Sequence, residues 1–440
     1  MKNFVEIETL YSSLEERTIE NLSQFYRKKR RLYEVVQRLM NKYFTEADIR
    51  NKSVLLKPNW VRHELKENDY ICLRTNDNIL IYIIEILLSL SPSKILIADA
   101  PVQGCNWDKM ISLDFLTEID NLSKKYHIPI YIKDFRRTVE DIKTKNVDIN
   151  IQPPSDYIIF DLGNNSYLEP ITTKDNRFRV TCYNPESMAK VHHKGMHKYC
   201  IANEIFDYDV IILIPKLKTH RMAGMTNALK LLIGINGDKG CLPHHRIGSL
   251  SQGGDNYPKK NVLRTLSAFL TDHANKRKDK WIRKPLIHMA TMLWRMSNPD
   301  KTTLENAGWY GNDTIWRTVL DVNKIALYGD KNGIIHDNQQ RTLFSIMDGV
   351  IGGQGDGPLN PVPSPLGIIA ISDNSYLMDV VAAKLYHLND SRIPLIREAR
   401  KIIDNIDYSI IVNSKKLKLN EVSAYGIDIN MSPGWEDYNK

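Results

Sequence analysis

Residues 209–234 read DVIILIPKLKTHRMAGMTNALKLLIG, which combines the signal for a buried strand with an unusual concentration of charge. The run 210–214 is continuously apolar, as is typical of a strand covered on both faces of a parallel sheet. Lys216 and Lys218 follow at a spacing of two, so their side chains point to one side of an extended chain. The first half of this stretch therefore predicts a buried strand that ends in two lysines.

The second half of the stretch predicts a change from strand to helix. Thr219 and His220 lead into a glycine-containing turn, and Thr226 is placed to cap a helix that carries Lys230. The free N–H groups and the positive dipole end of a helix start attract anions. Lysines beside such a helix start predict a pocket for phosphate or carboxylate.

Short apolar runs recur along the chain, and segments with helical periodicity separate them. This alternation predicts an α/β fold whose sheet is mostly parallel, with helices on both faces. The predicted strands are 53–58, 94–99, 128–135, 157–162, 209–218 and 367–372, and the predicted helices between them include 76–90, 108–126 and 375–387.

The chain has 440 residues, and a single core is difficult to extend beyond roughly 250–300 residues, so we expect two lobes. In open parallel sheets, ligands bind outside the carboxyl ends of the strands, here between the lobes. The predicted parts are a helical segment 1–50, a first α/β lobe 51–250 with a polar insertion near 164–199, a helical region 251–330 and a C-terminal α/β part 331–440.

Composition limits the classes of function. The formal net charge of +8 suits an anionic small molecule, a nucleic acid or an anionic membrane surface. Nucleic acid is disfavoured because the aromatic residues are not interleaved with basic residues, as a single-strand platform requires. The five scattered cysteines contain no CxxC pair, which argues against an iron–sulfur cluster and indicates reduced thiols in the cytoplasm. No window of about 18 apolar residues predicts a spanning helix.

Polar residues follow several predicted strands and are expected to meet at one edge of the sheet. Carboxylates from three segments are predicted to orient the basic groups or to bind a metal: Asp99, Asp348 and Asp379. The residues predicted to bind an anionic substrate are Lys57, Asn59, Lys216, Lys218, Thr219 and Thr226.

Histidines and one lysine are the candidate chemical groups. His220, Lys230, His244 and His245 are predicted to be catalytic, with the histidines as general acids or bases. His220 and His245 are alternatively candidate metal ligands, because imidazole binds zinc, nickel and iron. The sequence contains no HExxH or equivalent motif to fix such a metal site.

Three other segments each allow two interpretations. In GWYGNDTIWRTVLDVNKIALY (308–328), Asn312 and Arg317 either contact a ring-bearing ligand or belong to a helix in which Arg317 pairs with Asp321. The segment YRKKRR (26–31) is either a solvated helix face or an anion contact. The segment 276–296 is either a core helix with a basic start or an interfacial helix on anionic lipid.

The order of motifs resembles that of the DUF362 family. The motifs are LLKPNWV (55–61), PKLKTHRMAGMTNALKLLIG (215–234), GDKG (237–240), MDGVIGGQGDGP (347–358) and ISDNSYLMDVVAAKL (371–385). The WYGNDTIWR stretch resembles a branch of this family found beside polysaccharide-biosynthesis genes. The order of His220, a glycine-containing turn, Lys230 and His245 is also similar to that of the lactate racemase family, which uses a nickel-pincer nucleotide.

These resemblances imply an enzyme of racemase, epimerase or oxidoreductase type. Its substrate would be an anionic or hydroxylated small molecule, such as a sugar derivative or a hydroxy acid. A divalent metal or a nickel-pincer-like nucleotide is the cofactor that the second resemblance implies. The alternative is a cytoplasmic protein bound at the membrane surface, in contact with glycan-synthesis proteins.

Overall fold

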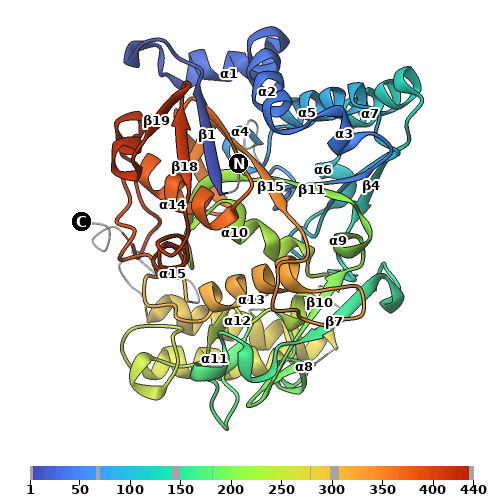
Figure 1. Ribbon diagram of the computed structural model, residues 1–440. Coiled ribbons are helices and arrows are strands. Elements are labelled where there is room, and N and C mark those ends of the chain that lie inside the picture. The colour runs from blue at the N-terminus through green and yellow to red at the C-terminus, as the bar shows by residue number, and fades with distance from the viewer. Residues whose placement is uncertain are drawn as a thin grey trace.

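A computed structural model describes residues 3–65, 70–140, 149–180, 182–277, 279–297 and 307–435. A large twisted sheet forms the upper part of the molecule, with helices on both faces, and a smaller sheet with further helices lies below it (Figure 1). This arrangement confirms the predicted α/β fold with a mostly parallel central sheet.

The central sheet has a parallel half and a mixed half. Strands β4, β3, β2, β11 and β15 are mutually parallel in this order, and β17, β1, β18 and β19 continue the sheet beyond β15. The strand bounds are β1 (Phe4–Thr9), β2 (Ser53–Pro58), β3 (Lys94–Asp99), β4 (Ile130–Asp134), β11 (Val210–Ile214), β12 (Lys216–His220), β13 (Gly224–Thr226), β15 (Leu343–Asp356), β16 (Asn360–Ser364), β17 (Ile368–Ser372), β18 (Ser409–Val412) and β19 (Lys415–Leu417).

Both faces of the parallel strands are buried, which explains their continuous apolar runs. Val54 and Leu56 belong to one core cluster and Leu55 to the other, because successive side chains of a strand point to opposite faces. Helices α1 (Ile19–Arg27), α2 (Lys29–Tyr43), α5 (Asp77–Ser89) and α7 (Leu113–Tyr126) supply the first cluster, and α13 (Ile315–Tyr328), α14 (Ser375–Leu385) and α15 (Pro394–Ile403) contribute to the second.

The lower part of the molecule is built around a three-stranded antiparallel sheet. Its order is β7 (Tyr157–Asp161), β10 (Met196–Ala202) and β9 (His192–His193). Helices α8 (Pro185–Val191), α11 (Val262–Asn275) and α12 (Lys280–Met296) belong to this part. The run 157–162 was predicted to extend the parallel series, but it pairs antiparallel with β10 and lies outside the central sheet.

The sequence had indicated that residues 1–50 are helical, but this segment begins with a strand. β1 lies between β17 and β18 in the central sheet, where Phe4, Val5 and Ile7 are buried. The charged residues of α1 and α2 hid this short strand from a composition-based interpretation.

The remaining elements are α3 (Glu46–Ile49), α4 (Tyr70–Leu73), α6 (Trp107–Met110), α9 (Glu204–Asp207), α10 (Ala228–Leu231), β5 (Thr138–Val139), β6 (Ile149–Asn150), β8 (Phe178–Arg179) and β14 (His245–Arg246).

Candidate active site

A cavity of about 500 Å³ opens where β2, β3 and β12 end and the chain enters α10. The loops after β2 and β3, the turn after β12, and α10 with the following segment line it. The predicted site residues that line it are Lys57, Asn59, Asp99, Lys218, His220, Thr226, Lys230 and His244. Three parallel-sheet segments therefore deliver their polar residues to one cavity, as the position of the strand ends predicts.

Lys57 and Asp99 form a buried ion pair in the cavity wall. Lys57 Nζ lies 2.6 Å from Asp99 Oδ1, and the Trp60 N–H donates to Asp99 Oδ2 at 2.7 Å. Gly234 lies directly against this pair, since a Cβ atom there would be 2.1 Å from Asp99 Oδ1 and 2.6 Å from Lys57 Nζ. Burial lowers the pKa of Lys57, and Asp99 opposes that shift. Asp99 therefore balances the charge of Lys57 within the cavity wall.

Lys216 and Asp348 form a second buried ion pair outside the cavity lining. Lys216 Nζ lies 2.9 Å from Asp348 Oδ2, and both residues are completely buried. The Tyr26 hydroxyl donates to Asp348 Oδ1 at 2.7 Å and accepts from Lys216 Nζ at 2.9 Å. The prediction that Lys216 binds an anionic substrate places this lysine wrongly, because its charge is already neutralised in the core.

Lys218, Lys230 and Lys239 are the uncompensated cations of the cavity. Within the described residues, none of the three has a carboxylate at ion-pair distance. Lys218 Nζ donates to the carbonyls of Leu73 and Pro358, Lys239 Nζ to that of Ile233, and Lys230 Nζ has no hydrogen bond to a described residue. Burial lowers the pKa of Lys218 and Lys239 to about 7 and that of Lys230 to about 8.

The two cavity histidines have opposite tautomers. His220 Nδ1 accepts the N–H groups of Met222 and Ala223 at 3.1 and 3.2 Å, so its hydrogen is on Nε2. His244 Nδ1 lies 2.6 Å from the carbonyl oxygen of Leu242 and must donate, which leaves Nε2 as an acceptor. Burial lowers the pKa of His244 to about 4 and that of His220 well below its usual range, so both rings are neutral near pH 7.

His245 does not belong to this cavity. It lies on β14, paired with Arg179 of β8, and it does not line the cavity that His220 and His244 share. No group of three metal-binding side chains occurs in the described parts of the chain. His220 is also a poor metal ligand, because its Nδ1 is occupied and its Nε2 carries the hydrogen. The predicted metal pair of His220 and His245 is therefore not assembled.

Asp379 and Thr219 have structural roles. α10 has only four residues, and the Leu229 N–H at its start donates to the carboxylate of Asp379 at 3.3 Å, so this helix start is already occupied. Burial raises the pKa of Asp379 to about 8. The Thr219 hydroxyl donates to the Gly355 carbonyl at 2.9 Å. By contrast, the buried Thr226 hydroxyl, which lines the cavity, has no hydrogen-bond partner among the described residues.

The comparisons with known proteins identify the family. The family model described as a domain of unknown function, DUF362, matches residues 164–384, which is half of the chain. The chain belongs to the DUF362 family. No curated protein and no solved structure matches it. The matched region contains Lys218, His220, Lys230 and His244, whereas Lys57 lies outside it.

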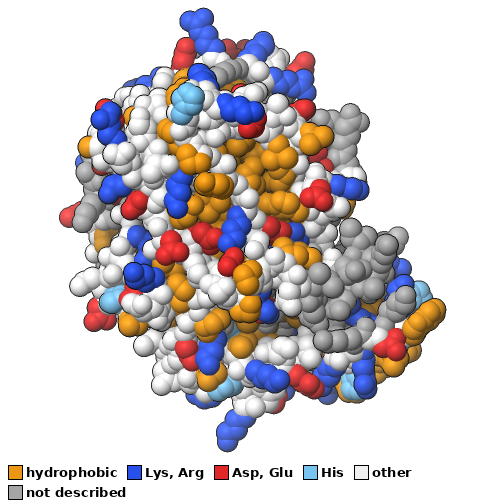
Figure 2. All heavy atoms as spheres, turned by 90° about the vertical axis from the view of Figure 1, so that its right-hand side faces the viewer, with side chains coloured by type: hydrophobic (Ala, Val, Ile, Leu, Met, Phe, Trp, Pro, Cys, Tyr) orange, Lys and Arg blue, Asp and Glu red, His pale blue; other side chains and the backbone are white. Residues whose placement is uncertain are grey.

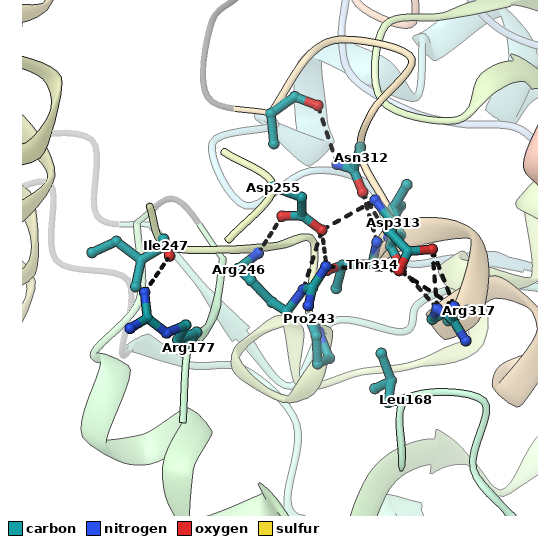
Figure 3. Close-up of polar contacts among 12 residues, drawn as sticks. Leu168, Arg177, Pro243, Arg246, Ile247, Asp255, Asn312, Asp313, Thr314 and Arg317 are labelled. Atoms are coloured by element: carbon teal, nitrogen blue, oxygen red, sulfur yellow. Dashed lines mark hydrogen bonds and ion pairs between the residues drawn. The ribbon is translucent and has the colours of Figure 1, made fainter. Parts of the chain in front are cut away.

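Asn312 and Arg317 of this DUF362 protein do not line the cavity. Asn312 Oδ1 accepts the N–H groups of Thr314 and Ile315 at the start of α13, both at 3.0 Å (Figure 3). Arg317 pairs with Asp313, one turn before it, at 3.2 Å. The predicted ring-binding role is therefore not supported.

A buried carboxylate organises this network. Asp255 accepts hydrogen bonds from the hydroxyl of Thr314 at 2.6 Å and from the N–H of Asp313 at 3.1 Å (Figure 3). These bonds connect the loop that contains Asp255 to the start of α13. Asp321, the ion-pair partner predicted for Arg317, instead accepts hydrogen bonds from Ser166, Tyr167 and Tyr199. No residue of α13 lines the cavity of this DUF362 protein, and the hydrogen bonds at the start of the helix hold the neighbouring segments in place.

Sequence reasoning missed several residues that shape the site. Lys239 lies in the quoted motif GDKG, in a loop with glycines at positions 237 and 240, and this motif was the available signal. Arg136 carries no such signal. Its guanidinium pairs with Asp134 at 2.6 Å. It also donates hydrogen bonds to the carbonyls of Val102, Gln103 and Cys105, and these bonds hold the loop after β3 in place beside the cavity.

Proposed function

We propose that this DUF362 protein is an isomerase-type enzyme that binds an anionic hydroxylated small molecule, such as a hydroxy acid or a sugar acid. The observation that supports this proposal most strongly is the concentration of three uncompensated lysines in one cavity. A desolvated lysine without a carboxylate is costly, and an anionic ligand removes that cost by supplying the missing partner. Lys218, Lys230 and Lys239 would bind the carboxylate or phosphate of the substrate.

The tautomers of the two histidines favour proton transfer at a carbon atom. His244 Nε2 has a free lone pair and would take the proton from a carbon next to the carboxylate. The electron pair left on that carbon would spread into the carboxylate, where the lysines stabilise the negative charge. Return of a proton from water to the opposite face of that carbon, with loss of the proton on His244 to solvent, would complete the isomerisation. His220 Nε2 carries a hydrogen and would donate a hydrogen bond to a carboxylate oxygen or to the neighbouring hydroxyl.

The resemblance to lactate racemases favours a hydroxy acid as the substrate class. It also implies a nickel-pincer nucleotide, which would supply a hydride acceptor when bound. His220 does not fit a metal-ligand role, because its Nδ1 accepts two backbone N–H groups and its Nε2 is protonated. No step of the proposed proton transfer therefore passes through that group.

Binding can be measured by calorimetric titration with inorganic phosphate and with D- and L-lactate at pH 8. Near this pH, Lys230 is partly neutral. An anion that binds beside it raises the pKa of Lys230, and the amine then takes up protons from the buffer. We expect Lys230→Met to weaken binding at least about tenfold, since a charge-assisted contact contributes about 1.5–3 kcal/mol. Equal binding by Lys230→Met and the parent protein would contradict an anion site in this cavity.

Catalysis can be measured by the exchange of the C2 proton of lactate and glycerate with D₂O, followed by NMR. His244→Gln should abolish the exchange because it removes the base. His245→Gln is the matched control, because His245 is the adjacent buried histidine and lies outside the cavity. Equal loss of exchange in both variants, or equal retention, would rule out His244 as the base.

A further inference from the structure

Helices α11 and α12 form a hairpin that exposes apolar side chains at helical spacing. On α12, Trp281 is 79% exposed, Met292 is 50% exposed and Met296 is 59% exposed. On α11, Val262 is 76% exposed and Phe269 is 55% exposed. The exposed apolar residues of the hairpin, called here the apolar stripes, are Val262, Leu266 and Phe269 on α11 and Trp281, Ile282, Met289, Met292 and Met296 on α12.

The apolar stripes lie on the outer sides of the hairpin. The Ser267 hydroxyl donates to the Ala290 carbonyl at 2.7 Å, and the Arg264 guanidinium lies 4.8 Å from the ring centre of Trp294. These contacts define the inner faces of both helices. Val262, Leu266 and Phe269 recur at steps of four and three residues, and Met289, Met292 and Met296 at steps of three and four. Each stripe lies on a different side of its helix from these contacts, so packing within the hairpin does not cover it.

The hairpin also carries the positive charge of the protein. Residues 259–297 contain ten lysines and arginines against two aspartates, a surplus of eight, which equals the net charge of +8 of the whole chain. The other residues are therefore balanced in charge. One of the two aspartates, Asp272, is already paired with Arg179 at 3.0 Å. Arg264 is buried against Trp294, and Lys276 pairs with Glu186 at 3.0 Å, so the surplus is carried by the other basic residues of the segment. Exposed apolar side chains on a basic segment complement a surface in which a negatively charged layer covers an apolar one.

A second apolar surface of the protein lacks this charge. Leu113 and Leu116 of α7, together with Tyr131 of β4, are 80%, 40% and 54% exposed. Their elements, α7 and β4, lie on the right-hand side of Figure 1, the side that faces the viewer in Figure 2, where hydrophobic side chains gather in the upper half. The segment 102–134 that contains them has four lysines against five acidic residues. Exposure of apolar side chains alone therefore does not distinguish the hairpin, whereas its charge does.

We propose that the α11–α12 hairpin binds the surface of an anionic lipid bilayer. The apolar stripes would enter the interface between headgroups and acyl chains, and the lysines and arginines would contact anionic headgroups. Within the described residues, no helix is long and apolar enough to cross a membrane. This proposal is independent of the reaction in the cavity.

The basic segment YRKKRR does not share this surface. It joins α1 and α2 at the top of the molecule in Figure 1, whereas α11 and α12 lie at the bottom. Its Tyr26 is buried in the hydrogen-bond network of Lys216 and Asp348. A flat bilayer therefore contacts the hairpin without this segment.

Flotation of the full-length protein with vesicles tests the proposal. We expect binding to vesicles of phosphatidylglycerol and phosphatidylcholine at low salt, release at high salt, and no binding to phosphatidylcholine alone. The variant Ile282→Ser/Met289→Ser/Met292→Ser should lower the partition coefficient at least tenfold. Lys284→Glu/Arg295→Glu should lower it about fivefold or more for each charge removed. Emission from Trp281 should shift to shorter wavelength on binding.

The matched control is Leu113→Ser/Leu116→Ser/Tyr131→Ser, which removes equally exposed apolar side chains from the surface without a charge surplus. It should bind vesicles within about twofold of the parent protein. Equal loss in the control, or equal binding to neutral and anionic vesicles, would overturn the proposal. Absence of vesicle binding together with a dimer that the hairpin variant dissociates, measured by light scattering, would identify the hairpin as a protein interface instead.

Discussion

The lysines of β2, β12 and α10 fall into two groups, which differ in whether a carboxylate neutralises their charge. Lys57 and Lys216 each contact a carboxylate, at 2.6 and 2.9 Å, and their charge is part of the core. Lys218 and Lys230 lie on the same chain segment as Lys216 and have no carboxylate at ion-pair distance in the described residues. Similar positions in the sequence, at a strand end or directly after it, therefore conceal a division between lysines that stabilise the fold and lysines that are available to a ligand.

The largest effect is expected when a compensated lysine loses its partner. Asp348→Asn leaves the fully buried Lys216 without a carboxylate and should lower the free energy of unfolding by about 3–5 kcal/mol. Denaturant-induced unfolding measures this loss. Lys216→Met/Asp348→Leu should cost less than Asp348→Asn, because no charge then remains buried. A double variant that is less stable than the single variant would show that the pair itself, and not its charge balance, stabilises the core.

An intermediate effect is expected at Gly234, which lines the cavity and lies against the Lys57–Asp99 pair. The Cβ atom of Gly234→Ala would overlap Asp99 Oδ1 and Lys57 Nζ, so the ion pair must move. We expect a loss of about 1–3 kcal/mol in the free energy of unfolding, as for other overpacked sites. Phosphate binding should weaken as well, because the displaced pair enters the cavity. Unchanged stability would mean that the pair moves at no cost.

The uncompensated lysines should make stability depend on pH. Burial lowers the pKa of Lys218, Lys230 and Lys239 to between about 7 and 8, whereas an unfolded chain has the ordinary value near 10.5. Between about pH 7 and pH 10 the unfolded state binds more protons, so the free energy of unfolding rises with pH, by up to about 1.4 kcal/mol per pH unit for one group.

Below about pH 6 all three lysines are charged in both states, so their contribution no longer changes with pH. Unfolding curves recorded between pH 7 and pH 9.5 for the parent protein and Lys230→Met should show a smaller slope in the variant. Saturating phosphate should also reduce the slope of the parent protein, because a bound anion favours the charged amines. A slope that neither change affects would mean that Lys230 keeps an ordinary pKa in the folded state.

The smallest effect is expected at Arg317, which lies outside both groups. Its guanidinium pairs with Asp313 and donates to the carbonyl of Tyr167 at 3.0 Å, away from the cavity. Arg317→Ala should lower the free energy of unfolding by about 0.2–1 kcal/mol, as for a partly exposed ion pair, and should leave phosphate affinity unchanged. A large loss of affinity would restore the ring-binding interpretation of the segment 308–328.

The sequence was a good guide to the strands and to the edge of the sheet where the cavity opens. The runs before Lys57, Asp99 and Lys218 are apolar because both sheet faces are covered, and such runs are recognisable without a structure. The strand 368–372 was also recognised, but its direction was not. It runs antiparallel to β15, so Asp373 lies at the opposite edge and accepts hydrogen bonds from the Asn3 and Phe4 N–H groups.

The sequence by itself determined the family, the α/β class, and the position of Lys218, His220 and Lys230 at one strand end and turn. Only the tertiary structure decided which charges remain available. Lys216 is neutralised by Asp348, 132 residues away in the chain, and His244 faces the cavity while His245 does not. Local sequence specifies period and propensity, whereas the pKa and the tautomer of a buried group depend on partners that folding brings from distant segments.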